Sequence, residues 1–230
     1  AGCCGRCSAA SSRISEYVHS AGIYHRDLKP ANCLVNIGCS VKVCDFGLAR
    51  AVGGEGACRE EASLLARRPP PRHLTSHVVT RWYRAPELIL MRGDYTELID
   101  MWSAGCIYAE LLGMREGVDP KDRGPLFRGT ACFPLSPHGN GQELAVPAAG
   151  AHRHAKDDQL EMIFDVIGTP TEAEVDMVDD VEAKKYLLSF ASRKGEGFNK
   201  RIPQADSNDC DVLRQLVCFH PEKRPSAEQL

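Results

Sequence analysis

Two motifs lie close together in this chain: His25-Arg26-Asp27-Leu28-Lys29-Pro30-Ala31-Asn32 and, a short interval later, Asp45-Phe46-Gly47. Between them are two short apolar runs, Cys33–Val35 and residues 41–44, joined by a link that contains Gly38. Runs of this length separated by a turn predict an antiparallel β-hairpin. Antiparallel pairing would bring the two open ends of the hairpin together, so that the first motif ends beside the start of the second.

The hairpin would therefore place Asn32 and Asp45 side by side. An amide oxygen and a carboxylate oxygen then converge, and these are the hard donors that Mg²⁺ on a triphosphate prefers. Asp27 precedes Asn32 on the same loop and can face the same cavity. A lone Asp is more often a surface charge or a helix cap, but these two occur inside short motifs of the kind that carry chemistry.

Composition narrows the class of protein. The chain has 230 residues, of which 43% are hydrophobic and 26% charged, and its formal net charge is -3. These values exclude wholesale disorder, and a slightly acidic chain gives no reason to expect nucleic-acid binding. No apolar run approaches the roughly 20 residues that a membrane span requires. The sequence begins at Ala1 without a secretory signal, so we expect a fragment or a processed product.

The chain has eleven cysteines, but few of them are spaced as metal ligands usually are. Only Cys4-Gly5-Arg6-Cys7 has a suitable interval, and no second Cys or His pair completes it at a zinc-like distance. His138, His152 and His154 have no framework of ligands around them. We therefore expect reduced thiols inside a cell and no metal site built from these residues.

Long irregular stretches separate the periodic ones. We expect a disordered N-terminal end at residues 1–13, a flexible loop at 51–74 and a solvated insertion at 133–156. Residues 14–22 should end a helix at Gly22. The stretch Leu98–Gly113 is apolar on nearly every side, which predicts a helix buried at the centre of a domain.

Three helical segments are expected in the C-terminal part. The first covers about residues 157–167 and should end at Gly168. The second should begin at Thr169-Pro170-Thr171-Glu172, with Thr169 as N-cap and Glu172 at N3 of a capping box. The third presents Val212, Leu213, Leu216 and Val217 on one face and should stop before Pro221.

A third motif, Ala85-Pro86-Glu87, completes a set. In this order the three motifs resemble the catalytic loop, the magnesium-binding triplet and the end of the activation segment of a eukaryotic protein kinase. The resemblance covers residues 14–230. It implies a mainly α (α+β, kinase-like) fold, namely the kinase C-lobe with a short β-hairpin at the catalytic loop and without an N-lobe.

The resemblance also implies roles for individual residues. Asp27 would accept or orient the proton of the substrate hydroxyl, and Lys29 would neutralise charge on the transferring phosphoryl group. Asn32 and Asp45 would hold the Mg²⁺ of bound ATP, and Leu34 would form the apolar floor under the adenine.

The segment Thr75-Ser76-His77-Val78-Val79-Thr80-Arg81-Trp82-Tyr83-Arg84-Ala85-Pro86-Glu87 looks like the activation lip of a mitogen-activated protein kinase. That family usually carries Thr-X-Tyr where this chain has Thr-Ser-His, so dual phosphorylation is in doubt. Thr75 is the implied phosphosite, since a phosphate brings about -2 charge and three acceptors that arginines can clamp. By resemblance those arginines are Arg26 and Arg50.

Other residues take implied roles from the same resemblance. Thr80 joins the catalytic residues, and the substrate platform comprises Arg81, Tyr83 and Arg84. Two further ties are structural: a buried ion pair between Glu87 and Arg224, and a link from Asp100 to the backbone of the catalytic loop.

The sequence thus predicts a serine/threonine kinase that uses ATP and Mg²⁺, acts on Ser/Thr-Pro sites in proteins and is switched on by an upstream kinase. Its expected location is the cytoplasm or the nucleus, without nucleic-acid or membrane partners. A Gly-rich loop, its partner Lys and a hinge are missing from this chain, since Gly53-Gly54-Glu55-Gly56 follows the magnesium triplet. The chain alone should therefore be inactive. The alternative is a non-catalytic lobe that binds substrates or scaffolds, and a relative of the cyclin-dependent kinases is a weaker third hypothesis.

Overall fold

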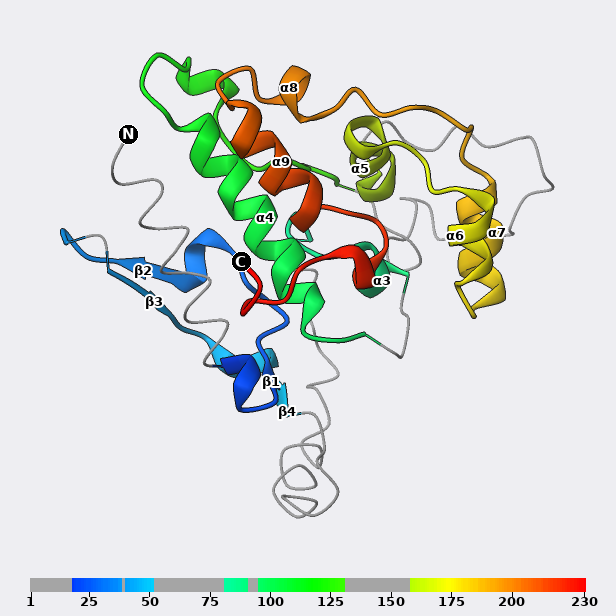
Figure 1. Cartoon of the computed structure of the whole chain (residues 1–230), viewed down its shortest axis with the longest axis horizontal. Coiled ribbons are helices and arrows are strands. Elements are labelled where there is room, and N and C mark those ends of the chain that lie inside the picture. Colours follow the sequence, from blue (N-terminus) through cyan, green and yellow to red (C-terminus); the bar gives the residue numbers. More distant parts are fainter. Residues whose placement is uncertain (1–17, 39, 52–80, 91–94, 131–157) are drawn as a thin grey trace.

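A computed structural model of the chain describes residues 18–38, 40–51, 81–90, 95–130 and 158–230 (Figure 1). Several expectations lie outside the described residues: the N-terminal end, the metal-spaced cysteines, Thr75, Thr80, most of the loop 51–74 and the insertion 133–156. The described part is mostly helical, with two small antiparallel sheets. In that part, every helix falls short of the length and apolar character needed to cross a membrane.

The centre of the fold is α4 (Leu98–Gly113), drawn in green in Figure 1. Trp102, Cys106 and Leu112 on this helix are completely buried, so the predicted central helix is confirmed with both of its ends. Its amphipathic contrast is weak because neighbouring elements cover it on several sides, and even Asp100 and Glu110 are buried.

Helix α9 (Ser207–Leu216) lies along α4 in Figure 1. The two helices approach closely at Gly105, where a Cβ would stand 2.7 Å from Val217 Cγ2 and 2.8 Å from Leu216 Cβ. Cys210 and Leu213 complete the buried face of α9. The apolar spacing near the C-terminus therefore predicts the right helix and the right face.

Helix α5 (Gln159–Ile167) follows α4 in the chain order of helices. It begins after its N-cap Asp158 and ends before Gly168, whose φ is 90°. For the helix that follows, the sequence predicts a capping box that begins two residues before the observed one. Helix α6 (Glu172–Asp176) has Thr171 as N-cap and Glu174 as its reciprocal partner. The earlier Thr169 is occupied elsewhere, because its hydroxyl accepts the backbone N–H of Arg193 at 3.0 Å.

Shorter elements complete the chain. They are the helices α3 (Pro86–Ile89), α7 (Val181–Leu188) and α8 (Phe198–Arg201), and the 3₁₀ turns Pro30–Asn32, Phe46–Leu48, Pro120–Asp122 and Pro221–Lys223.

The expected hairpin consists of β2 (Cys33–Val35) and β3 (Val41–Val43), with Cys33 opposite Val43 and Val35 opposite Val41. A second pair, β1 (Ile23–Tyr24) with β4 (Arg50–Ala51), was not expected. Strands of two residues leave no periodicity in a sequence. The hairpin of β2 and β3 lies between the two chemistry-bearing motifs, and β1 and β4 pair just outside them, so both ends of this segment are brought together (Figure 1).

Candidate active site

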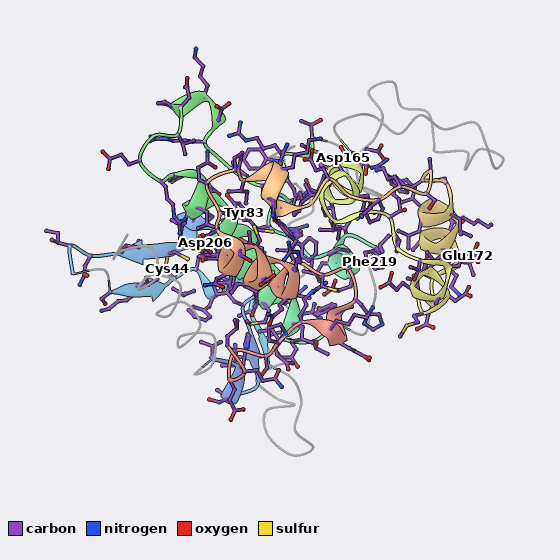
Figure 2. All side chains as sticks on the ribbon, turned by 45° about the horizontal axis from the view of Figure 1, so that its top comes forward. Cys44, Tyr83, Asp165, Glu172, Asp206 and Phe219 are labelled. Carbon is purple, nitrogen blue, oxygen red and sulfur yellow. The ribbon has the colours of Figure 1, made fainter. Side chains whose placement is uncertain are left out.

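The open end of the hairpin is closed by backbone contacts. The N–H of Cys44 donates to the carbonyl of Asn32 at 2.9 Å, and the Cys44 thiol lies 3.4 Å from the same oxygen. Asp45 is the next residue, so the ends of the two motifs meet as the antiparallel pairing predicts. Figure 2 labels Cys44 at this inner end of the hairpin.

Three polar side chains of the first motif form one cluster. The Lys29 ammonium lies 2.5 Å from Asp27 Oδ2. The Asn32 amide donates to the carbonyl of Asp27 at 2.9 Å, and its nitrogen stands 3.5 Å from Asp27 Oδ2. Asn32 is only 5% exposed, so this contact fixes the loop rather than adding a surface bond. The structure thus brings the predicted Asp27, Lys29 and Asn32 together.

A buried carboxylate on α4 holds the loop from behind. Asp100 accepts the N–H of His25 at 2.8 Å and the N–H of Arg26 at 2.9 Å. His19 Nε2 approaches the same carboxylate at 3.0 Å. These bonds fix Arg26 in the left-handed region, with φ 68°. The expected tie between Asp100 and the loop backbone is therefore present.

Sequence reasoning missed the role of two histidines. His25 is 2% exposed, its Nε2 lies 3.0 Å from the carbonyl of Cys44, and its Nδ1 stands 3.3 Å from the N–H of Asp27. It therefore bridges the two motifs directly. The position of His25 inside the first motif could have indicated its role. Nothing in the sequence indicates the contact of His19 with Asp100.

Asp45 is exposed and has a left-handed backbone, with φ 64°. The following turn leaves little room, because a Cβ on Gly47 would stand 3.2 Å from Asp45 Oδ1. A glycine here keeps the carboxylate accessible. Oxygen donors from Asp45 and Asn32 suit Mg²⁺, which favours carboxylate, amide and water oxygens. The residues present therefore fit Mg²⁺.

The arginines expected to clamp a phosphate take different positions. Arg26 Nη1 donates to the carbonyl of Leu48 at 3.3 Å, and its guanidinium lies 5.2 Å from the centre of the Tyr95 ring. Arg50 is exposed on β4. Because Thr75 is outside the described residues, the clamp stays a prediction. Leu34, the predicted adenine floor, is 57% exposed on β2.

The segment that leads into α3 is anchored from beneath. Tyr83 is buried, and its hydroxyl donates to Glu110 Oε2 at 2.6 Å. Burial, followed by the Glu110 carboxylate, raises the pKa of Tyr83 well above its ordinary value. Its side chain therefore supports the expected platform from inside the lobe, while Arg81 and Arg84 are half-buried.

The predicted pair of Glu87 and Arg224 is present and bidentate. Arg224 Nη1 lies 2.6 Å from Glu87 Oε1, and Nη2 lies 2.9 Å from Oε2. Each residue is 3% exposed. The guanidinium also sits 5.0 Å from the centre of the Trp102 ring. Through Arg224, the segment that contains Glu87 is thus fixed to the first turns of α4.

Comparison with known proteins agrees with this geometry. The family described as the protein kinase domain matches residues 12–124. Mitogen-activated protein kinase 4 of Oryza sativa subsp. japonica is 38% identical over 93% of this chain. The homolog NTF3 of Nicotiana tabacum is 36% identical over 92%, and the kinase spk1 of Schizosaccharomyces pombe is 35% identical over 94%.

The chain belongs to the mitogen-activated protein kinase family. It spans 45%, 44% and 46%, respectively, of the length of these three relatives. Among the residues that the structure describes, no group of three or more His, Cys, Asp or Glu side chains is arranged to hold a metal alone.

Proposed function

We propose that this chain forms the catalytic lobe of a serine/threonine protein kinase that transfers the γ-phosphoryl group of ATP to Ser or Thr residues followed by Pro. The observation that carries the proposal is the cluster of Asp27, Lys29 and Asn32 at the inner end of the hairpin, where the backbone of Cys44 bonds to Asn32 and Asp45 follows. A carboxylate, an ammonium and an amide in contact, with a second carboxylate one residue beyond that bond, suit phosphoryl transfer, in which positioning and charge stabilisation supply most of the catalysis.

In this proposal Asp27 receives and orients the hydroxyl of the substrate. Its carbonyl and carboxylate are held by Asn32 and Lys29, so the oxygen facing the substrate has a fixed direction. Lys29 lies beside Asp27 and can donate to the phosphoryl oxygens as negative charge develops there.

Asn32 and Asp45 would hold Mg²⁺. The ion, when bound, would supply neutralising charge across the phosphates of ATP. The left-handed backbone of Asp45 and the missing side chain of Gly47 keep that carboxylate accessible. Leu34 would lie under the adenine, and its 57% exposure leaves it free to do so.

Regulation is proposed to occur at Thr75. A phosphate there would be clamped by Arg26 and Arg50, and an upstream protein kinase would supply it. Thr80 would assist catalysis, and Arg81 and Arg84 would form the platform for the protein substrate. His77 has no hydroxyl, so a single phosphothreonine would replace the usual pair.

The test uses the longest natural protein that contains this chain. We expect Asp27→Asn to lower ATP-dependent phosphorylation of a Ser-Pro peptide by about 10²-fold or more. The matched control is Asp211→Asn, on the exposed face of α9, which should leave the rate unchanged. A peptide with Ala in place of Pro should react more slowly.

Near-parent turnover of Asp27→Asn would contradict the catalytic assignment. Stable substrate binding without any turnover in the parent would instead favour the non-catalytic lobe. Because this chain supplies no Gly-rich loop and no partner Lys, we expect little turnover from the 230 residues alone.

A further inference from the structure

A second site candidate lies away from the catalytic loop. A cavity of about 510 Å³ opens between α5 and residues 193–201. Asp165, on its wall, is labelled in Figure 2 on the side of the molecule away from the hairpin that carries Cys44. The cavity has the volume of ordinary small-molecule sites, about 300–1,000 Å³. Four of its lining residues are basic: Arg193, Lys194, Lys200 and Arg201.

The wall of this cavity is fixed in place by backbone contacts. The N–H of Glu196 donates to the carbonyl of Asp165 at 2.8 Å, and the N–H of Gly197 donates to that of Val166 at 2.9 Å. Gly195 permits this approach, because a Cβ there would lie only 2.3 Å from the Val166 oxygen. The same bonds occupy helix-end carbonyls that would otherwise repel an anion.

The charges of the cavity do not cancel. Its two carboxylates already have partners: Asp165 pairs with Arg193 at 3.2 Å, and Glu196 pairs with Lys200 at 3.3 Å. Arg201 donates to a neutral acceptor, the carbonyl of Leu126, at 3.2 Å. Lys194 is exposed and forms no ion pair within the described part of the chain. Two cations on the wall therefore lack a counter-charge there.

A buried donor points to the same kind of ligand. Arg193 Nε is buried and has no acceptor among the described residues, although both terminal nitrogens of this guanidinium are bonded, to Glu161 and Asp165. A buried donor without an acceptor is unfavourable. The cations Lys194 and Arg201, which have no counter-charge on the wall, favour a ligand that brings several acceptor oxygens over one that brings donors.

We propose that this cavity binds an organic phosphate monoester. The phosphate dianion would lie between Lys194 and Arg201, whose charge-assisted bonds suit phosphate oxygens. The carbon body of the ligand would rest on Met162, the partly exposed apolar side chain of the lining. This site is separate from the catalytic loop, and neither ATP binding nor phosphoryl transfer is needed for it.

The test is titration of the 230-residue chain with phenyl phosphate at low ionic strength, followed by calorimetry and by amide chemical shifts. We expect shifts confined to α5 and residues 193–201. Lys194→Gln should weaken binding about ten-fold, since it removes one charge-assisted bond, and Lys194→Arg should restore it. The matched control is Lys185→Gln on exposed α7, which should bind as the parent does.

Further probes separate the headgroup from the body. Inorganic phosphate should bind more weakly at the same residues, because it leaves Met162 uncovered. Phenyl sulfate, a monoanion of similar shape, should also bind more weakly. Shifts at the catalytic loop instead of residues 193–201, equal binding by Lys194→Gln, or no detectable heat would each overturn the proposal. None of these outcomes bears on the catalytic assignment, which depends on Asp27.

Discussion

At the scale of single residues, the most constrained side chain is the guanidinium of Arg224. It is 3% exposed and donates to Glu87 and to three backbone carbonyls, those of Cys218, Leu98 and Phe219. A buried pair of this kind gains little over an apolar pair, but removing one partner leaves the other charge buried and uncompensated. The Glu87–Arg224 pair should therefore matter for stability mainly when one of its two residues is removed.

We expect Arg224→Ala to lower the free energy of unfolding by about 3–5 kcal/mol. The measurement is urea unfolding followed by circular dichroism. The matched control is Arg214→Ala, which removes an exposed ion pair with Asp211 on α9 and should lower stability by less than about 1 kcal/mol. Similar losses for the two variants would show that burial of the Glu87 pair is not the deciding factor.

The sequence predicts this level of detail well where a motif fixes the residue types. Asp27, Lys29 and Asn32 come together as expected, and Asp100 reaches the loop backbone. It predicts poorly where a contact depends on the fold alone. Nothing in the sequence indicates that His19 meets a carboxylate 81 residues later.

At the scale of elements, the contact between α4 and α9 determines how the lobe is packed. Gly105 on α4 has no space for a side chain, because Leu216 and Val217 stand against it. Glycine is usually unfavourable inside a helix, so a close approach is the reason for its presence here. A Cβ added at Gly113, the last residue of the same helix, would meet nothing within 4 Å.

This pair of glycines gives a matched test. We expect Gly105→Ala to lower the free energy of unfolding by about 1–3 kcal/mol through overpacking, despite the better helix propensity of alanine. Gly113→Ala should be neutral or stabilising by up to about 1 kcal/mol. Thermal and urea unfolding of both variants provide the measurement. Stabilisation by Gly105→Ala would mean that α9 moves aside easily.

The sequence pattern predicts the long helices well, but it predicts a cap or a short strand poorly where neighbouring residues offer equal alternatives. The central helix was expected with the bounds it has, because sixteen apolar-rich residues leave a strong signal. The capping box came two residues early, since Thr169 and Thr171 both precede acidic residues and only the pairing with Arg193 separates them. The pair of β1 and β4 was missed because it joins residues far apart in the chain.

At the scale of the whole molecule, acid stability depends on carboxylates held in their charged form. Burial opposes ionisation of Asp209, but hydrogen bonds from Tyr108 and from the Asp206 backbone, with the Arg115 guanidinium, outweigh it and lower its pKa. For Glu174, burial is likewise outweighed by bonds from Thr171 and Lys223, and its pKa is also lowered.

The direction of the pH effect follows from these shifts. A carboxyl whose pKa is lower in the folded state stabilises the fold above its unfolded pKa, about 4, and that contribution disappears as the pH falls through the folded pKa. We expect the free energy of unfolding to decline below about pH 4.5. Asp209→Asn should lower stability at pH 7 and flatten this decline. Urea titrations at several pH values measure both, and an unchanged slope would contradict the assignment.

The whole-molecule arrangement shows where prediction from sequence ends. The cavity beside α5 combines residues 162–166 with residues 193–201, and its charge pattern exists only after the two segments meet. The catalytic cluster, in contrast, lies within one loop and one hairpin, which is why local patterns suffice for it.

The left-handed backbone at Arg26 and Asp45 has a consequence for evolution. Such a conformation disfavours most residues with a side chain by about 1–2 kcal/mol, although Asp and Asn tolerate it better, and glycine at either position would relieve it. Glycine at position 45 would, however, remove a carboxylate, and at position 26 a guanidinium. In a duplicated copy released from selection for chemistry, substitution to glycine at these two positions would therefore raise heat resistance. Thermostable but inert descendants of this chain should be found carrying glycine there first.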